Sequence, residues 1–168
     1  MRKLIPIFLI TLFLAHPSWA ASPKSGDAAP DFSLSAMTGG KHTLSDLKGK
    51  VVLVGMFHIC VPCMNQAMEF EKVREALSTD KLVILGINTS GDSKKAVENY
   101  LAGFPKPVNF PYLLDPDQTV HKAYIQRDMP TVLIIDSKGA LRVRSPSVGA
   151  DQLVPYLKKL LYASSPSR

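Results

Sequence analysis

The feature that most constrains the fold is an apolar run followed at once by a pair of cysteines. The run covers residues 51–57, and the chain's only two cysteines, Cys60 and Cys63, come directly after it. An apolar run of this length is typical of a strand covered on both faces, as in the centre of an α/β sheet. After it, apolar residues recur at the spacing of a helix face, at Cys63, Ala67, Phe70, Val73 and Leu77. The sequence therefore predicts a buried strand, a short turn that carries Cys60, and a long helix.

The rest of the chain supplies the other elements of such a sheet. Strands are predicted at residues 82–87 and 131–135, with a hairpin at 31–34 and 42–44 and an exposed strand at 141–144. Helices are predicted from Asp92 or Ser93 to about 101, at 115–124 and at about 151–161, with a proline-rich link at 105–111. This order predicts an α/β fold whose mixed central sheet is flanked by helices on both faces. Nothing marks a second domain, so residues 21–168 are predicted to form one domain.

The first twenty residues have the pattern of a signal peptide. Arg2 and Lys3 form a positive start, residues 4–15 form an apolar core, and Ser18 and Ala20 are small residues at the positions that a signal peptidase reads. The apolar core is shorter than the ~20 residues that span a bilayer. We therefore expect cleavage and export to the periplasm or the outer face of the cytoplasmic membrane, with a retained anchor as the alternative. Because exported thiols meet an oxidising compartment, the two cysteines are expected to pair.

The charge of the chain excludes one class of partner. The formal net charge is +6, and two of the positive residues, Arg2 and Lys3, lie in the predicted signal peptide. The remaining positive charge is spread along the sequence, without a basic cluster interleaved with aromatic residues. Nucleic-acid binding is therefore not supported.

The predicted position of the cysteines suggests unequal chemical roles. At the start of a helix, Cys60 would face unpaired backbone N–H groups, which favour the thiolate and lower its pKa. Cys63, one turn later on the apolar face, would be covered and remain a thiol. Cys60 could then attack a disulfide and Cys63 resolve the mixed disulfide, while Pro62 suits the first helical turn. The alternative is an inert bridge or two small buried residues.

A metal site is a second possible use of the thiols. Structural zinc needs four ligands, and the chain has no second cysteine pair. Copper could use Cys60, Cys63 and one histidine, with His121 or His58 as the candidates. In the redox hypothesis, His58 could instead stabilise the Cys60 thiolate when protonated or accept its proton when neutral. A histidine exposed in a loop is the simpler interpretation of His58.

A proline stands directly before the strand predicted at 131–135. In Met129-Pro130-Thr131, Pro130 has no N–H for a central ladder, so it indicates a bend, with a cis peptide bond as one form. The alternative interpretation is that Pro130 is an ordinary proline at the start of a strand.

Several of these stretches together resemble the TlpA/ResA-type extracytoplasmic thioredoxins, over about residues 26–162. The matching stretches are Ala29-Pro30-Asp31-Phe32, residues 44–54, Cys60-Val61-Pro62-Cys63, Tyr124 with Met129-Pro130-Thr131, and residues 135–139. The resemblance implies a thioredoxin-like fold with an N-terminal β-hairpin and an inserted strand–helix region. It also implies that Pro130 is a cis-proline packed beside the disulfide, flanked by Met129 and Thr131.

The resemblance further implies thiol–disulfide exchange, commonly reductive, on exported client proteins such as apocytochromes c in cytochrome c maturation. Electrons would come from a membrane thiol transporter, and no cofactor beyond the Cys60–Cys63 disulfide is expected. A copper chaperone of the Sco type shares the fold, but those proteins place three residues between their cysteines. A peroxidase of the peroxiredoxin type needs a threonine three residues before the reactive cysteine, where this chain has Phe57.

The chain also departs from the family pattern near the cysteines. Phe57-His58-Ile59 replaces a lead-in that usually carries tryptophan and is one residue longer, and Gln66 and Met68 replace a frequent glutamate and proline. No carboxylate occupies the buried strand position that helps to move a proton in thioredoxin. The direction of electron flow depends on a difference of tens of millivolts, which the sequence does not give.

Overall fold

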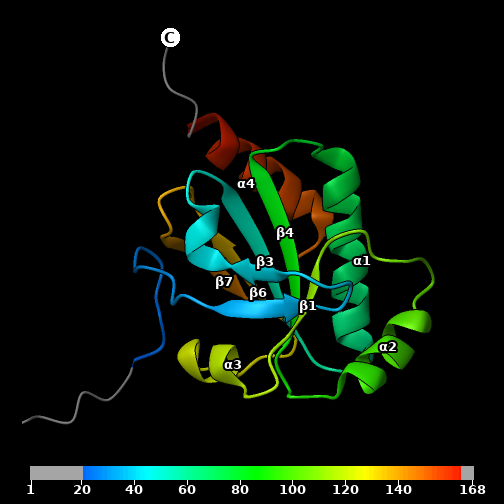
Figure 1. The fold of residues 1–168 in the computed structure, drawn as a ribbon. Helices are drawn as coiled ribbons and strands as arrows, with labels where there is room; N and C mark the ends of the chain where they lie inside the picture. Colours follow the sequence, from blue (N-terminus) through cyan, green and yellow to red (C-terminus); the bar gives the residue numbers. More distant parts are fainter. Residues whose placement is uncertain (1–20, 164–168) are drawn as a thin grey trace, which may run out of the picture.

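The computed structural model of the protein describes residues 21–163 (Figure 1). The predicted signal peptide, residues 1–20, lies outside the described part of the chain. The strands are β1 (Ser33–Ala36), β2 (Lys41–Thr43), β3 (Val51–Phe57), β4 (Leu82–Asn88), β5 (Tyr112–Leu114), β6 (Thr131–Ile135) and β7 (Leu141–Ser145). The helices are α1 (Val61–Ala76), α2 (Lys94–Ala102), α3 (Thr119–Ala123) and α4 (Ala150–Ala163), with a 3₁₀ helix at Leu44–Leu47.

The strands form one mixed sheet with β3 near its centre. The strand order is β2-β1-β5-β4-β3-β6-β7, in seven strands. β3 runs parallel to β4 and antiparallel to β6, so Met56 pairs with Ile87 on one side and with Thr131 on the other. The predicted mixed α/β architecture is confirmed, and every residue of β3 is buried.

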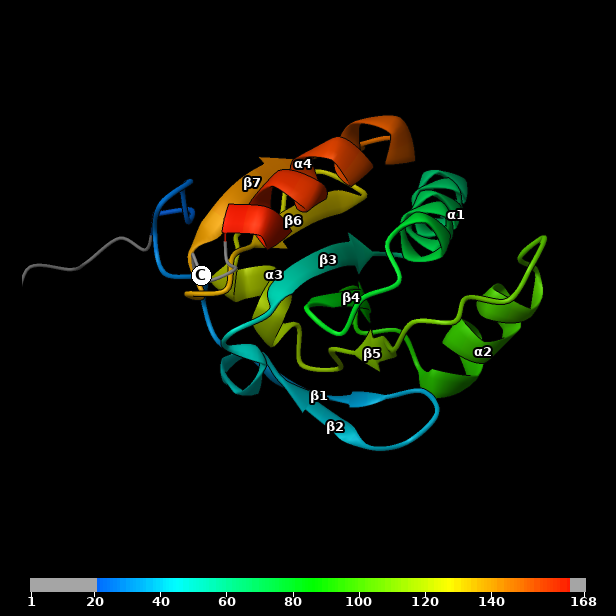
Figure 2. The ribbon, with the colours of Figure 1, turned by 90° about the horizontal axis from the view of Figure 1, so that it is seen from above.

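Alternate residues of β3 point into two separate hydrophobic cores. Val51, Leu53 and Phe57 pack with α1, α2 and α4, whereas Val52 and Val54 pack with α3 and the 3₁₀ helix. Figure 2 shows α1 and α4 over one side of the sheet and α3 on the other. A side chain at Gly55 would collide with the Phe57 ring, so only glycine lets that ring lie back along the strand.

β1 begins two residues later than the hairpin arm predicted at 31–34, and two other elements differ more from the sequence prediction. The link predicted at 105–111 leads into β5, whose three residues pair with β4 and β1 and are too few to give a periodic pattern. α3 begins four residues later than predicted because Asp115 lies outside it and accepts the backbone N–H groups of Thr119, Val120 and His121 at 2.7, 2.9 and 3.1 Å. The stretch between β4 and β6 contains α2, β5 and α3.

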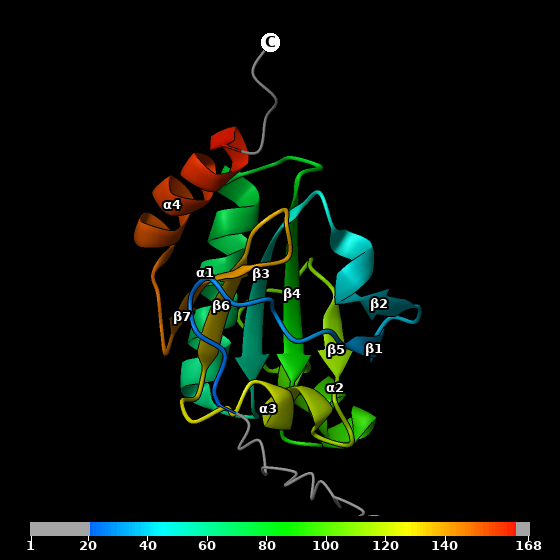
Figure 3. The ribbon, with the colours of Figure 1, turned by 90° about the vertical axis from the view of Figure 1, so that its left-hand side faces the viewer.

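The ends of β3 and β4, the start of α1, α2 and α3 gather at one end of the molecule (Figure 3). None of the helices among residues 21–163 has the length and apolar character to cross a membrane.

Candidate active site

The two cysteines form a disulfide where β3 gives way to α1. Cys60 has an extended backbone (φ −154°, ψ 155°) and caps α1, which starts at Val61 with Pro62 in its first turn. The Cα atoms of Cys60 and Cys63 are 5.3 Å apart, within the usual range for a disulfide. The local geometry is therefore the one that the spacing predicted: one cysteine at the helix start and one a turn later.

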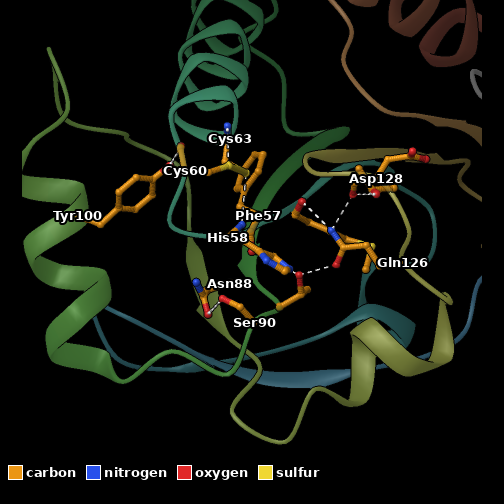
Figure 4. The surroundings of a disulfide bond; sticks show 12 residues. Phe57, His58, Cys60, Cys63, Asn88, Ser90, Tyr100, Gln126 and Asp128 are labelled. Atoms are coloured by element: carbon orange, nitrogen blue, oxygen red, sulfur yellow. Dashed lines mark hydrogen bonds between the residues drawn. A yellow bond between two sulfur atoms is a disulfide. The ribbon is translucent and has the colours of Figure 1, made fainter.

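Each sulfur receives a backbone hydrogen bond. The N–H of Cys63 donates to Cys60 Sγ at 3.2 Å, and the N–H of His58 donates to Cys63 Sγ at 3.3 Å (Figure 4). Cys63 is 1% exposed, whereas Cys60 is only partly buried. A backbone N–H that donates to a sulfur favours its thiolate, so each cysteine has a donor that would stabilise its thiolate. Of the two, only Cys60 is accessible to another molecule.

The tyrosine of α2 holds the main-chain carbonyl of Cys60. Tyr100 Oη donates to the carbonyl oxygen of Cys60 at 2.6 Å, and burial raises the pKa of Tyr100. The sequence predicts a helix over this segment but gives no sign of what Tyr100 contacts. The helix itself starts at Lys94 because the Ser93 hydroxyl accepts the N–H of Ala96 at 3.2 Å.

The Met129–Pro130 peptide bond is cis. Because Thr131 pairs with Met56, Pro130 lies one step further along, beside the end of β3 where the cysteine turn begins. Pro130 is buried and Met129 is 52% exposed. The Thr131 hydroxyl donates to the carbonyl of Asp128 at 2.6 Å, which closes the loop before Pro130.

Sequence reasoning missed a buried amide beside this loop. Gln126 Nε2 donates to the carbonyls of Met56 and Asp128 at 3.2 and 3.1 Å, and Gln126 Oε1 accepts from the Thr89 hydroxyl at 2.6 Å (Figure 4). The side chain thus joins the end of β3, the residue after β4 and the loop that leads to Pro130. A single polar residue in an irregular segment has no periodicity that could have identified it.

The imidazole of His58 points away from the two sulfurs (Figure 4). The ring extends away from the disulfide (Figure 4) and lies 6.2 Å from the His121 ring, centroid to centroid. Burial lowers the pKa of His58, His121 lowers it further, and Asp92 acts in the opposite direction. In this orientation, the hydrogen bond of His58 to the disulfide comes from its main-chain N–H.

The structure does not assemble the copper site considered from the sequence. Within residues 21–163, no group of three or more histidine, cysteine, aspartate or glutamate side chains is arranged to hold a metal ion. Cys60 and Cys63 are joined to each other, and His121 packs against His58.

Gln66 fastens the loop before α4. Its Nε2 donates to the Val148 carbonyl at 2.8 Å, and its Oε1 accepts the Val148 N–H at 2.9 Å. One turn later, Glu69 accepts the N–H of Ala150 at 2.8 Å, and its pKa is lowered first by Lys72 and then by this bond. A cleft of about 340 Å³ lies between the loop and the start of α1, lined in part by Pro62 and Gln66.

The surface around the disulfide is apolar. Ile59 and Val61 flank Cys60 in the sequence and are 43% and 64% exposed, and Met129 precedes the buried Pro130. Phe57, at the position where a peroxidase of the peroxiredoxin type needs threonine, is fully buried and stacks on Tyr112 with ring centroids 5.9 Å apart. Phe57 is therefore a buried aromatic side chain, and it lacks the hydroxyl that a peroxidase of this type needs at this position.

Comparisons with known proteins agree with this geometry. The model of the AhpC/TSA family matches residues 25–144. The thiol-disulfide oxidoreductase ResA of Bacillus subtilis (strain 168) is 32% identical over 130 residues, which cover 77% of this chain and 71% of the relative. The thioredoxin-like protein YneN of the same organism is 31% identical over 152 residues, covering 84% and 88%.

A solved structure shows the same fold. It is the crystal structure of a Chlorobium tepidum protein assigned as a thiol:disulfide interchange protein DsbE, with a TM-score of 0.70 and 25% identity over 85% of this chain and 99% of that one. The thioredoxin-like fold expected from the resemblance is thus confirmed. The chain belongs to the AhpC/TSA family and, within it, to the thioredoxin-like thiol–disulfide oxidoreductases of the ResA type.

Proposed function

We propose that the protein reduces disulfides in exported client proteins, with Cys60 as the nucleophile and Cys63 as the resolving thiol. The observation that carries the proposal is the unequal surroundings of the two sulfurs. Cys60 is accessible at the start of α1, whereas Cys63 is buried behind it, and each sulfur already faces one backbone N–H.

The exchange proceeds in two balanced steps. The Cys60 thiolate attacks one sulfur of a client disulfide, which forms a mixed disulfide and releases the other client sulfur as a thiolate that takes up a proton. Cys63 then loses its proton and attacks Cys60 Sγ, which releases the second client thiolate. The Cys60–Cys63 pair is oxidised by two electrons, and the client disulfide is reduced by two.

The apolar surface around the disulfide gives the client a place to lie. Ile59, Val61 and Met129 together suit an unfolded segment that carries apolar side chains next to its cysteine. The cleft beside Pro62 can receive a neighbouring client side chain. Pro130 brings no N–H to the end of β3, while Thr131 and Gln126 hold its loop against that strand.

Export and the partners follow from the sequence and the resemblance. A signal peptide at residues 1–20 would deliver the domain across the cytoplasmic membrane. There, a membrane thiol transporter would reduce the Cys60–Cys63 disulfide after each cycle, and apocytochrome c is the proposed client. The disulfide is the only redox group that this cycle requires.

Trapping of the mixed disulfide tests the two roles. In Cys63→Ser, the Cys60 thiol should accumulate covalent complexes with periplasmic proteins, because nothing resolves them. In Cys60→Ser, the buried Cys63 should trap none, and the double variant controls for non-covalent capture. Equal trapping by both single variants, or by neither, would contradict the assignment of Cys60 as the nucleophile and Cys63 as the resolving thiol.

A further inference from the structure

Helix α2 reaches the catalytic turn through the hydroxyl of Tyr100. Tyr100 lies near the end of α2, and its side chain points at Cys60 (Figure 4). Its hydroxyl donates to the Cys60 carbonyl oxygen at 2.6 Å. The same carbonyl accepts the N–H of Met64 at 3.0 Å, which is the first hydrogen bond of α1. Two donors from two different helices therefore fix one peptide group.

That peptide group sets where the Cys60 sulfur lies. Cys60 is the residue that caps α1, so the orientation of its carbonyl determines how the next three residues enter the helix. The N–H of Cys63, at the end of this turn, donates to Cys60 Sγ at 3.2 Å. If the carbonyl turned outward to water, the turn would open and the sulfur would lose this donor.

We propose that Tyr100 is a positioning residue that holds the Cys60 sulfur against the N–H of Cys63 and so lowers the pKa of the Cys60 thiol. The proposal rests on the assignment of Cys60 as the nucleophile. It gives α2 a direct part in the chemistry of the cysteine turn.

The surroundings of Tyr100 allow the hydroxyl to be removed alone. Its ring packs edge-on against Phe104, with centroids 4.9 Å apart and planes at 90°. Tyr100→Phe keeps this packing and removes only the donor, whereas Phe104→Leu removes the ring contact and keeps the hydroxyl. A hydrogen bond of ordinary net strength corresponds to an equilibrium change of about three- to tenfold.

The experiment measures the alkylation rate of reduced protein across about pH 4 to 9, where thiolates at helix starts titrate. In Tyr100→Phe, we expect the midpoint of the pH–rate profile to move upward and the rate at pH values below the wild-type midpoint to fall by about three- to tenfold. The reduction potential should become more negative, because the reduced form loses stabilisation of its thiolate. Phe104→Leu and the exposed Tyr156→Phe should keep the wild-type midpoint.

A purely structural role gives a different result. Val73→Ala, a core substitution towards the far end of α1, lowers stability without touching the turn, and it should leave the midpoint unchanged. An unchanged midpoint in Tyr100→Phe, or an equal shift in Val73→Ala, would overturn the proposal while leaving the role of Cys60 intact. Alkylation of Cys63 in place of Cys60, read by peptide mapping, would overturn both.

Discussion

The hydroxyl of Thr89 donates a 2.6 Å hydrogen bond to the side-chain carbonyl of Gln126, and both residues are buried. Thr89 also donates its N–H to the carbonyl of Phe57 at 2.9 Å, while the Gln126 amide donates to that of Met56. The last two carbonyls of β3, directly before the cysteine turn, are therefore held by this pair. The pair links the disulfide to the loop that carries Pro130.

Removal of the Gln126 amide should destabilise the protein and loosen the site. Gln126→Met keeps the volume but leaves buried groups without partners, which costs about 1–3 kcal/mol. Thr89→Val should cost less, and the double variant should cost less than the sum, because the two side chains share a hydrogen bond. Urea unfolding of all four proteins measures the coupling, and strictly additive effects would contradict the proposed link.

Acid should weaken the protein through His58. Burial and the neighbouring His121 lower the pKa of His58 in the folded protein, whereas the unfolded chain titrates near about 6.5. Between these two pKa values the unfolded chain binds more protons than the folded protein. The stabilisation that comes from neutral His58 is therefore fully present above about pH 6.5 and is lost as the pH falls towards the folded pKa.

His58→Asn should lose less stability than the wild type between about pH 7 and 5, and His42→Asn, on β2, is the matched control. Urea midpoints across this range give the comparison. An identical acid dependence in His58→Asn and wild type would show that the pKa of His58 does not contribute.

The strand and the helix start around the cysteines were predictable because their signals are local. The apolar run became β3, and Cys63 is buried because it lies on the apolar face of α1. The bonds from Tyr100 to Cys60 and from Gln126 to Met56 were not predictable, since they join residues 40 and 70 positions apart. Their geometry depends on how complete elements pack.

His58, just before the cysteines, shows the same limit of prediction from the sequence. His58 attracted attention as a titrating side chain, but the turn directs its main-chain N–H to Cys63 and its imidazole away. Side-chain chemistry was readable from the sequence, whereas the position of that side chain beside His121, 63 residues further along the chain, was not.

Gln66→Glu should destabilise the loop before α4. A carboxylate can still accept the N–H of Val148, but it cannot donate to the Val148 carbonyl, and it would be a charge at a position only 3% exposed. We expect a loss of about 1–3 kcal/mol at neutral pH. Because burial raises a carboxyl pKa, the deficit should shrink in acid. The exposed Gln152→Glu on α4 is the control, and a deficit that does not depend on pH would contradict the explanation.

Met129→Asp should impair client binding without changing the thiol. A charge at this exposed apolar position would disfavour an apolar client segment, and we expect the rate of client reduction to fall by at least about fivefold. The rate with a small symmetrical disulfide should change much less. Tyr162→Asp, at another exposed apolar position on α4, should leave both rates unchanged. Equal losses on both substrates would show that the substitution changes the reactivity of the thiol and not client binding.

Reductive exchange is tested most directly by the reduction potential of the Cys60–Cys63 couple. The protein would be equilibrated with thiol–disulfide buffers at neutral pH, and the reduced fraction would be read by alkylation and mass spectrometry. We expect a value near that of thioredoxin, about −270 mV. A value near about −120 mV, as in a strong disulfide donor, would contradict the proposed role as a reductant.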